Sequence, residues 1–207
     1  MRTFAYCSQS FGHLMSRVAG TSPILCPPVT METFEPSSLE GHDLLLFKLH
    51  GLKGQPYWYG DDHITALSAG QLAPADGSVG PDLQGAVVFV ANCWLTDHHG
   101  KPGPMLKALF EANPAAIIGG SGPTYALRDG IGGPDLLALY LRFFLQLGFP
   151  VANAFRLARL RLCLKRPDRV TQNTLTFRLY EHLPDTLLPA PVSPNPITAQ
   201  SAAAKES

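Results

Sequence analysis

The amino-acid sequence predicts an α/β domain whose sheet is mostly parallel. Two short apolar runs, residues 43–50 and 86–93, are dominated by Leu, Val, Ala and Phe. Each run has the length and composition of a buried parallel strand. Segments with helical spacing of apolar residues alternate with such runs along the chain, which is the layout of an α/β fold.

The first fifty residues contain three expected strands. Residues 2–7 and 22–26 are short apolar runs, and two prolines stop the second run. A short helix is expected between them over residues 11–18, and residues 36–40 suit one helical turn. The third strand is the run that ends at His50.

Residues 52–85 show no clear periodicity. They are rich in Gly, Pro, Ser and Asp, with an aromatic cluster at Tyr57-Trp58-Tyr59. A segment of this length in a compact domain usually forms hairpins and a functional loop. The aromatic cluster suits either the floor of a groove or the paired strands of a hairpin.

The second half of the domain begins with the strand that ends at Cys93. The expected elements after it are a polar loop (96–103), an amphipathic helix (104–111), a buried strand (115–119), two helices (134–147 and 151–165) and an edge strand (176–180). The helix over 134–147 is apolar almost all round, which is typical of a helix buried between layers.

Length and composition set the domain organisation. A chain of 207 residues is long enough for one well-buried domain and short for two, so residues 1–183 are expected to form a single domain. After Leu183 the composition turns to Pro, Ala and Ser, which cannot bury a core. We therefore expect residues 184–207 to be a disordered tail.

Charge and cysteine content exclude several functional classes. The formal net charge is zero and only 15% of residues are charged, which argues against nucleic acid or anionic lipid as a partner. The four cysteines lie far apart without a CxxC pair, which argues against a disulfide framework and a structural zinc site. No signal peptide or membrane span is predicted, so we expect a soluble, cytoplasmic protein. We also expect no cofactor.

His50 and Cys93 are the candidate catalytic residues. Each ends an apolar strand, and active sites of open α/β sheets lie at the carboxyl ends of strands. The separation of 43 residues suits neighbouring strands, which would bring an imidazole and a thiol to one edge, as a cysteine nucleophile requires. The backbone N–H groups of Gly51 and Cys93 could then donate to a tetrahedral oxyanion, because Gly51 has no side chain to obstruct it.

Two acidic and histidine-rich segments have alternative interpretations. Residues 61–63 (Asp-Asp-His) and 97–99 (Asp-His-His) contain metal-ligating atoms, but consecutive residues point in different directions, so solvated loops are favoured. Asp97, four residues after Cys93, could instead line the substrate pocket. Asp129 and Arg128 follow a glycine-rich turn and could contact a charged substrate side chain, or belong to a surface turn without a role.

The order of these segments resembles the caspase-like cysteine peptidases, and most closely their bacterial CHAT branch. The resemblance rests on the His50-Gly51 and Cys93 strands and on residues 109–120, 139–148 and 151–158, and it covers about residues 38–183. It implies a three-layer sandwich with helices on both faces of a mostly parallel sheet. It also implies His50 and Cys93 as a dyad, Gly51 and Cys93 as oxyanion donors, and no metal in the chemistry.

The sequence around the nucleophile departs from the strict caspase pattern. Caspases have Gln-Ala-Cys followed by a small or basic residue and Gly, whereas this chain has Ala91-Asn92-Cys93-Trp94. Trp94 is therefore expected to shape a different substrate pocket. The expected function is that of a cysteine endopeptidase that cleaves a specific protein and can have a regulatory protein partner. The alternatives are an inactive interaction module and a metal-dependent hydrolase.

Overall fold

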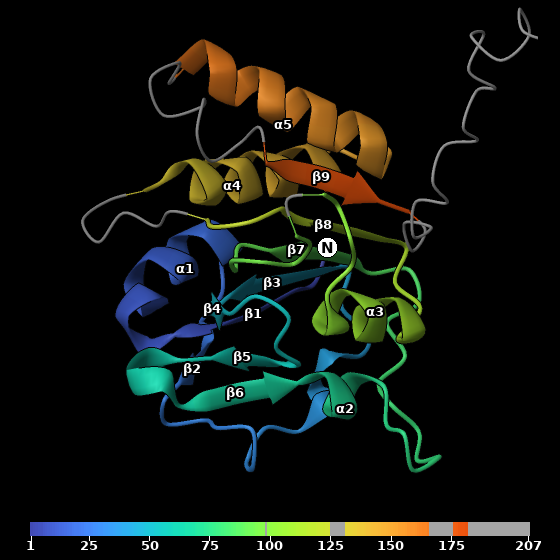
Figure 1. Cartoon of the computed structure of the whole chain (residues 1–207). Helices are drawn as coiled ribbons and strands as arrows, with labels where there is room; N and C mark the ends of the chain where they lie inside the picture. Colours follow the sequence, from blue (N-terminus) through green and yellow to red (C-terminus); the bar gives the residue numbers. More distant parts are fainter. Residues whose placement is uncertain (98, 125–130, 166–175, 182–207) are drawn as a thin grey trace, which may run out of the picture.

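The computed structural model describes residues 1–97, 99–124, 131–165 and 176–181. A six-stranded sheet forms its centre (Figure 1). In spatial order the strands are β2 (Ile24–Cys26), β1 (Thr3–Ser8), β3 (Leu44–Lys48), β7 (Val87–Val90), β8 (Ala116–Gly120) and β9 (Phe177–Tyr180). The first five strands are parallel and β9 is antiparallel to β8. The predicted mostly parallel sheet and its C-terminal edge strand are confirmed.

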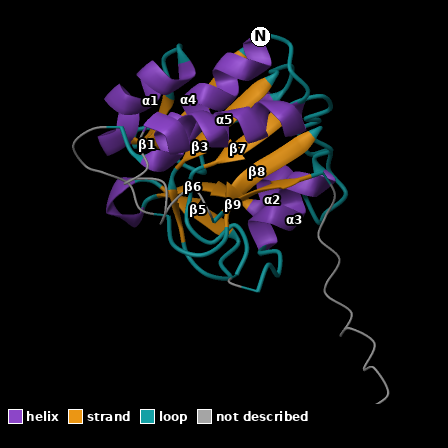
Figure 2. Cartoon of the chain, turned by 90° about the horizontal axis from the view of Figure 1, so that it is seen from above, coloured by secondary structure: helices purple, strands orange, loops and turns teal. Residues whose placement is uncertain are grey.

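Three helices cover one face of this sheet (Figure 2). They are α1 (Gly12–Ala19), α4 (Gly133–Gln146) and α5 (Val151–Lys165). Their apolar residues form one core cluster with alternate residues of β1, β3 and β7. The first two turns of α4 are buried between layers as expected, but Phe143 near its end is 47% exposed.

The other face carries two helices and a second sheet. The helices are α2 (Ala69–Leu72) and α3 (Pro104–Glu111), and the antiparallel sheet consists of β4 (His50–Gly51), β5 (Tyr57–Tyr59) and β6 (Thr65–Ser68). The indole of Trp58 is buried against Phe47, with ring centroids 5.1 Å apart. The hairpins expected within residues 52–85 are therefore present, and they complete the third layer of the sandwich.

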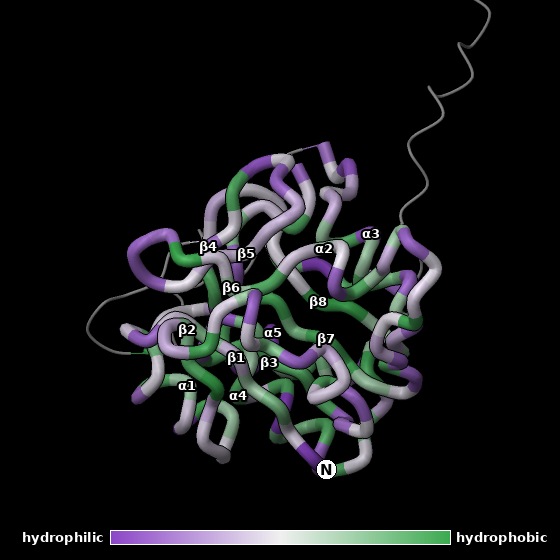
Figure 3. Tube along the Cα trace, turned by 90° about the horizontal axis from the view of Figure 1, so that it is seen from below, coloured by the Kyte–Doolittle hydropathy of each residue, from purple (hydrophilic) through white to green (hydrophobic). Residues whose placement is uncertain are grey.

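Three short 3₁₀ turns connect these elements. They are η1 (Gln9–Phe11), η2 (Pro36–Leu39) and η3 (Asp61–His63). The expected helix over residues 11–18 is α1, shifted by one residue and preceded by η1, and the predicted helical turn near Pro36 is η2. Figure 3 shows hydrophobic residues along β7 and β8 in the interior and hydrophilic residues on the connecting loops.

Two predictions, the C-terminal tail and the substrate-contacting turn at Arg128 and Asp129, concern residues that the structure does not describe. The predicted tail, residues 184–207, lies outside the described ranges, as do Arg128 and Asp129. Among the described helices, none is both long enough and apolar enough to span a lipid bilayer.

A buried ion pair lies beneath the carboxyl edge of the sheet. Lys48, the last residue of β3, pairs with Asp135 in the first turn of α4, and their side chains are 3% and 1% exposed. The other carboxylate oxygen of Asp135 accepts the backbone N–H of Gly132 at 2.9 Å. Because two buried charges require a partner and full hydrogen bonding, this pair fixes α4 against the end of β3.

Candidate active site

His50 and Cys93 follow neighbouring strands, as predicted. In the β3–β7 pair, Leu44 lies opposite Val87, an offset of 43 residues (87 minus 44). His50 and Cys93 have the same offset (93 minus 50), so both follow the carboxyl ends of adjacent parallel strands. The structure therefore brings both residues to one edge of the sheet.

The strands end slightly earlier than the sequence indicates. β3 ends at Lys48 and β7 ends at Val90, so both candidate residues lie beyond the main sheet. The N–H of Leu49 donates to the side-chain oxygen of Asn92 at 2.7 Å, in place of a backbone partner. After this bond the chain leaves the main sheet, and His50 begins β4, where it lies opposite Tyr59.

Gly51 lies against the backbone of Cys93. A Cβ atom added to Gly51 would be 2.1 Å from the carbonyl oxygen of Cys93 and 3.5 Å from its nitrogen. A side chain does not fit at that separation, so glycine is required for this close backbone approach. The contact joins the segment that contains His50 to the residue that carries the thiol.

The Cys93 thiol is half-buried and hydrogen bonded to Thr124. It donates to the Thr124 carbonyl oxygen at 3.4 Å and accepts the Thr124 N–H at 3.2 Å. The Thr124 hydroxyl also donates to the carbonyl of Asn92 at 3.3 Å. The N–H bond can persist with a thiolate, whereas the bond to the carbonyl requires the thiol proton.

The His50 imidazole lies between an aromatic ring and a carboxylate. Its Nε2 is 3.8 Å from Oδ1 of Asp61, and its ring centroid is 5.9 Å from that of Phe11. The side chain is 49% exposed, so it is accessible to solvent and to a substrate. Neither of these contacts joins the imidazole to the Cys93 thiol.

Asp61 is a site residue that the sequence analysis assigned to a solvated loop. Its two carboxylate oxygens accept the N–H of Ser10 at 2.7 Å and the Ser10 hydroxyl at 2.8 Å. Ser10 belongs to η1 after β1, so two connections hold this carboxylate beside His50. The neighbours Asp62 and His63 are exposed and have positive φ angles of 54° and 58°. The solvated-loop interpretation fits Asp62 and His63, whereas the Asp61 side chain is partly buried, 26% exposed, and bonded to Ser10.

Thr124 and Ser10 gave no signal in the sequence. Each lies in an irregular segment and reaches the site only because its strand ends at the same edge. Among the five parallel strands, the segments after β1, β3, β7 and β8 all contribute a residue here. This convergence depends on the strand order, which no local pattern specifies.

No metal site is assembled in the part of the chain that the structure describes. Within those ranges, no group of three or more His, Cys, Asp or Glu side chains comes together. Asp97 binds its own loop, since its Oδ1 accepts the N–H groups of His99 at 2.9 Å and Lys101 at 2.8 Å. The hydrogen bond from the Lys101 N–H, and to a smaller extent that from the His99 N–H, lowers the pKa of Asp97, which favours the ionised carboxylate.

Trp94 and Asp97 line one cavity beside the candidate nucleophile. This cavity has a volume of about 400 Å³ and also includes Lys53, Lys101 and Lys107 in its wall. The Trp94 N–H donates to the Gly122 carbonyl at 2.8 Å, which ties the residue after Cys93 to the segment after β8. Asp129, the third residue predicted for this pocket, is outside the described residues.

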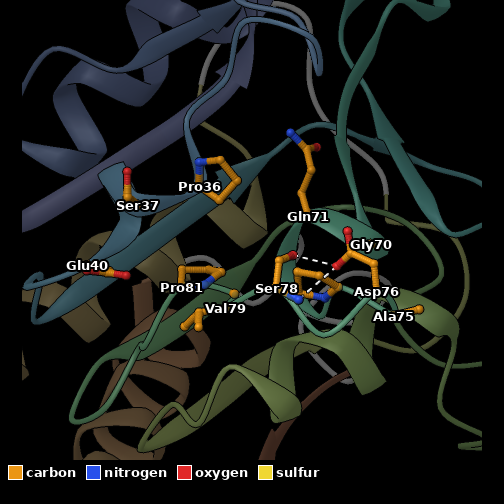
Figure 4. A pocket seen from close by; sticks show the side chains of 12 residues that line it. Pro36, Ser37, Glu40, Gly70, Gln71, Ala75, Asp76, Ser78, Val79 and Pro81 are labelled. Atoms are coloured by element: carbon orange, nitrogen blue, oxygen red, sulfur yellow. Dashed lines mark hydrogen bonds between the residues drawn. The ribbon is translucent and has the colours of Figure 1, made fainter.

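A larger cavity lies at the opposite edge of the sheet. It has a volume of about 840 Å³, and its wall includes Pro36, Glu40, Gln71 and Pro81 (Figure 4). Glu40 and Pro81 precede β3 and β7, whereas His50 and Cys93 follow these strands. The candidate active site is therefore separate from this larger cavity.

Known structures share this architecture. No model of a known protein family matches the chain, and no curated protein matches it. The crystal structure of the Arg-specific cysteine proteinase gingipain R is similar with a TM-score of 0.52 and 14% sequence identity, over 81% of this chain and 43% of that one. The complex of the Porphyromonas gingivalis RgpB pro- and mature domains gives a TM-score of 0.56 and 13% identity, over 86% and 46%.

These similarities concern the fold. The chain spans less than half the length of the two gingipain chains, and the sequence identities are low. The shared features are the mostly parallel six-stranded sheet and its flanking helices. The protein therefore has the caspase-like α/β fold of the gingipain catalytic domain.

Proposed function

We propose that this protein is a cysteine endopeptidase that uses Cys93 as nucleophile and His50 as general acid and base. The proposal rests on one observation above all, the placement of both residues at the carboxyl edge of adjacent strands with Gly51 packed on the Cys93 backbone. The caspase-like fold supports it, because gingipain R is a cysteine proteinase. The order of the motifs in the sequence supports the further proposal that its nearest relatives are the CHAT branch of the caspase-like peptidases.

The proposed reaction proceeds through an acyl-enzyme. His50 accepts the thiol proton, and Cys93 Sγ forms a bond to the peptide carbonyl carbon. The tetrahedral intermediate then collapses, the C–N bond breaks and His50 gives its proton to the leaving amine. Water, deprotonated by His50, cleaves the thioester and regenerates the thiol. The N–H groups of Gly51 and Cys93 are the proposed donors to the oxyanion.

Asp61 and Thr124 have supporting roles in this proposal. Asp61 faces Nε2 of His50 and leaves Nδ1 for the thiol, as the third group of a catalytic triad does. The Thr124 carbonyl holds the thiol proton in the free protein, so the thiol must leave that carbonyl before His50 receives its proton. Substrate binding beside Trp94 is the proposed trigger.

Peptide cleavage with matched cysteine variants tests the proposal. The full chain is incubated with a library of peptides derived from a proteome, and new termini are identified by mass spectrometry. We expect cleavage that shares a sequence pattern, that Cys93→Ala abolishes, and that His50→Ala slows by about a hundredfold or more, because general acid–base catalysis contributes that much. A chelator should leave the rate unchanged.

The exposed Cys163 supplies the control. Cys163→Ala removes a thiol far along the chain from the candidate site and should cleave as the natural protein does. Cleavage that survives Cys93→Ala, or no cleavage of any peptide by the natural chain, would contradict the proposal.

A further inference from the structure

The cavity beside Cys93 is built by the two segments that directly follow the proposed catalytic residues. Lys53 and Gly54 come from the connection after β4, and Trp94, Thr96 and Asp97 come from the connection after β7. A peptide whose carbonyl carbon is at Cys93 Sγ must place neighbouring side chains near these segments. The cavity is therefore positioned to receive a substrate side chain close to the cleaved bond.

Lysine dominates the charge of this cavity. Its charged wall residues are Lys53, Lys101, Lys107 and Asp97, which gives a net charge of plus two (three minus one). All three lysines are exposed, and no carboxylate of the described residues lies within 4.0 Å of their ammonium groups. None of the three ammonium groups is therefore in a salt bridge with a described carboxylate.

Asp97 does not supply a free counter-charge for a basic ligand. One of its carboxylate oxygens accepts two backbone N–H groups of its own turn, from His99 and Lys101. Its negative charge also attracts Lys53, the ammonium group of which lies 5.7 Å from the centroid of the Trp94 ring. Asp97 thus fixes the turn and one lysine, while Lys101 and Lys107 remain without a partner of opposite charge.

The rest of the wall suits a short side chain with an apolar stem. Trp94, Pro102 and Pro104 contribute apolar surface, Gly103 is the N-cap of α3 and Pro104 is its first residue. The partial positive charge at the N-terminus of α3 adds to the field of the lysines. A carboxylate on one or two methylene groups fits this combination, and a guanidinium or ammonium group does not.

We infer that this cavity selects an acidic side chain, Asp or Glu, next to the cleaved bond of a peptide substrate, and that Lys101 and Lys107 bind its carboxylate. The inference rests on the proposed function for the position of the substrate. It sets this protein apart from the Arg-specific proteinase that shares its fold. The proposed difference in substrate preference follows from the charge of the cavity and not from the fold.

Matched covalent probes test the inference. Acyloxymethyl ketones of N-acetylated Asp, Asn and Lys react with the full chain, and mass spectrometry measures the rate of labelling at Cys93. We expect the Asp probe to react about five- to tenfold faster than its isostere Asn, because two exposed ion pairs contribute roughly that factor. Lys101→Ala combined with Lys107→Ala should remove this preference, and Lys101→Glu with Lys107→Glu should shift it toward the Lys probe. Raising the salt concentration should weaken the preference of the natural chain.

Two controls separate this inference from the proposed function. The ratio of the Asp rate to the Asn rate within each variant cancels any change at the nucleophile, and Lys165→Ala, on the exposed end of α5, removes the same charge elsewhere and should keep the ratio of the natural chain. Equal rates for the Asp and Asn probes, or a preference that survives the double lysine variant, would overturn the inference. If no probe labels Cys93, the proposed function fails instead.

A binding measurement then decides the inference without catalysis. Fluorescence polarisation of a labelled Asp-containing hexapeptide with Cys93→Ala should show binding that the double lysine variant weakens at least fivefold and that Lys165→Ala leaves unchanged. Binding that is equal for Asp-containing and Asn-containing hexapeptides would reject the acidic subsite.

Discussion

Gly51 is the residue on which the geometry of the candidate site depends most directly. Its Cα faces the carbonyl oxygen of Cys93, and a methyl group there would overlap with that oxygen. The overlap involves backbone on both sides, so no side-chain rotation can relieve it. The two strand tips would have to separate.

We therefore predict that Gly51→Ala lowers both stability and reactivity. The expected loss in the free energy of unfolding is about 1–3 kcal/mol, as for other overpacked sites, and the labelling rate of Cys93 should fall. Urea unfolding and probe labelling measure the two effects. Gly70→Ala is the matched control, because the nearest atom to an added Cβ at Gly70 is 3.9 Å away and its φ angle is not positive. Equal behaviour of the two variants would contradict the assigned packing.

Individual site residues differ in how far the sequence predicts them. His50, Gly51 and Cys93 could be found because each follows an apolar run that identifies a strand. Asp61 and Thr124 could not be found, because their contacts join residues 11 and 31 positions apart through the tertiary structure. An Asp in a Gly-rich turn has no local feature that distinguishes a histidine partner from a solvated side chain.

At the scale of elements, the contact between β3 and α4 contains the only ion pair of the described residues in which both side chains are buried. Lys48 and Asp135 are both buried, and the ammonium group of Lys48 also lies 4.6 Å from the centroid of the Phe11 ring. The centroid of that ring is also 5.9 Å from the centroid of the His50 imidazole. The ion pair thus contacts, through Lys48, the aromatic ring that packs beside His50.

We predict that Lys48→Met destabilises the protein by about 3–5 kcal/mol, because it leaves the carboxylate of Asp135 buried without a counter-charge. Urea unfolding measures the loss. Adding Asp135→Asn should recover much of the stability, since an amide oxygen can still accept the Gly132 N–H without a charge. If Lys48→Met lowers the free energy of unfolding by less than about 1 kcal/mol, then Lys48 and Asp135 do not form a buried ion pair.

Sequence patterns gave the bounds of the long elements, but for the second sheet they gave only a region of expected hairpins. The strands β3, β7 and β8 and the helices α3, α4 and α5 were predicted within a few residues, because each has a sustained apolar pattern. The strands β4, β5 and β6 have two to four residues each, and a register irregularity interrupts the pairing of β5 with β6. Segments this short contain too few alternations to be assigned from sequence.

At the scale of the whole molecule, the parallel sheet has a cavity at each of its two edges. The carboxyl edge carries His50, Cys93 and the lysine-rich cavity of about 400 Å³, and the other edge carries the cavity of about 840 Å³. A choice between these two cavities by volume alone would select the edge without His50 and Cys93. The strand topology, and not the cavity volume, locates the candidate site.

The four cysteines occupy four different environments in the molecule, which makes them internal standards for one another. Cys7 and Cys26 are buried, Cys163 is exposed, and Cys93 is half-buried beside Gly51 and Thr124. Burial raises the pKa of Cys7 to about 12 and also raises that of Cys26. Because their thiols stay protonated and covered, both should be unreactive up to pH 9.

The most direct test of the central claim is the alkylation rate of each cysteine by iodoacetamide, followed by mass spectrometry between about pH 5 and 9. If His50 activates Cys93, then Cys93 reacts faster than the exposed Cys163 below about pH 8, and His50→Ala removes the difference while Cys163 reacts as before. If Cys93 reacts no faster than Cys163 and its rate is the same in His50→Ala, then the two residues are not a catalytic pair in this protein.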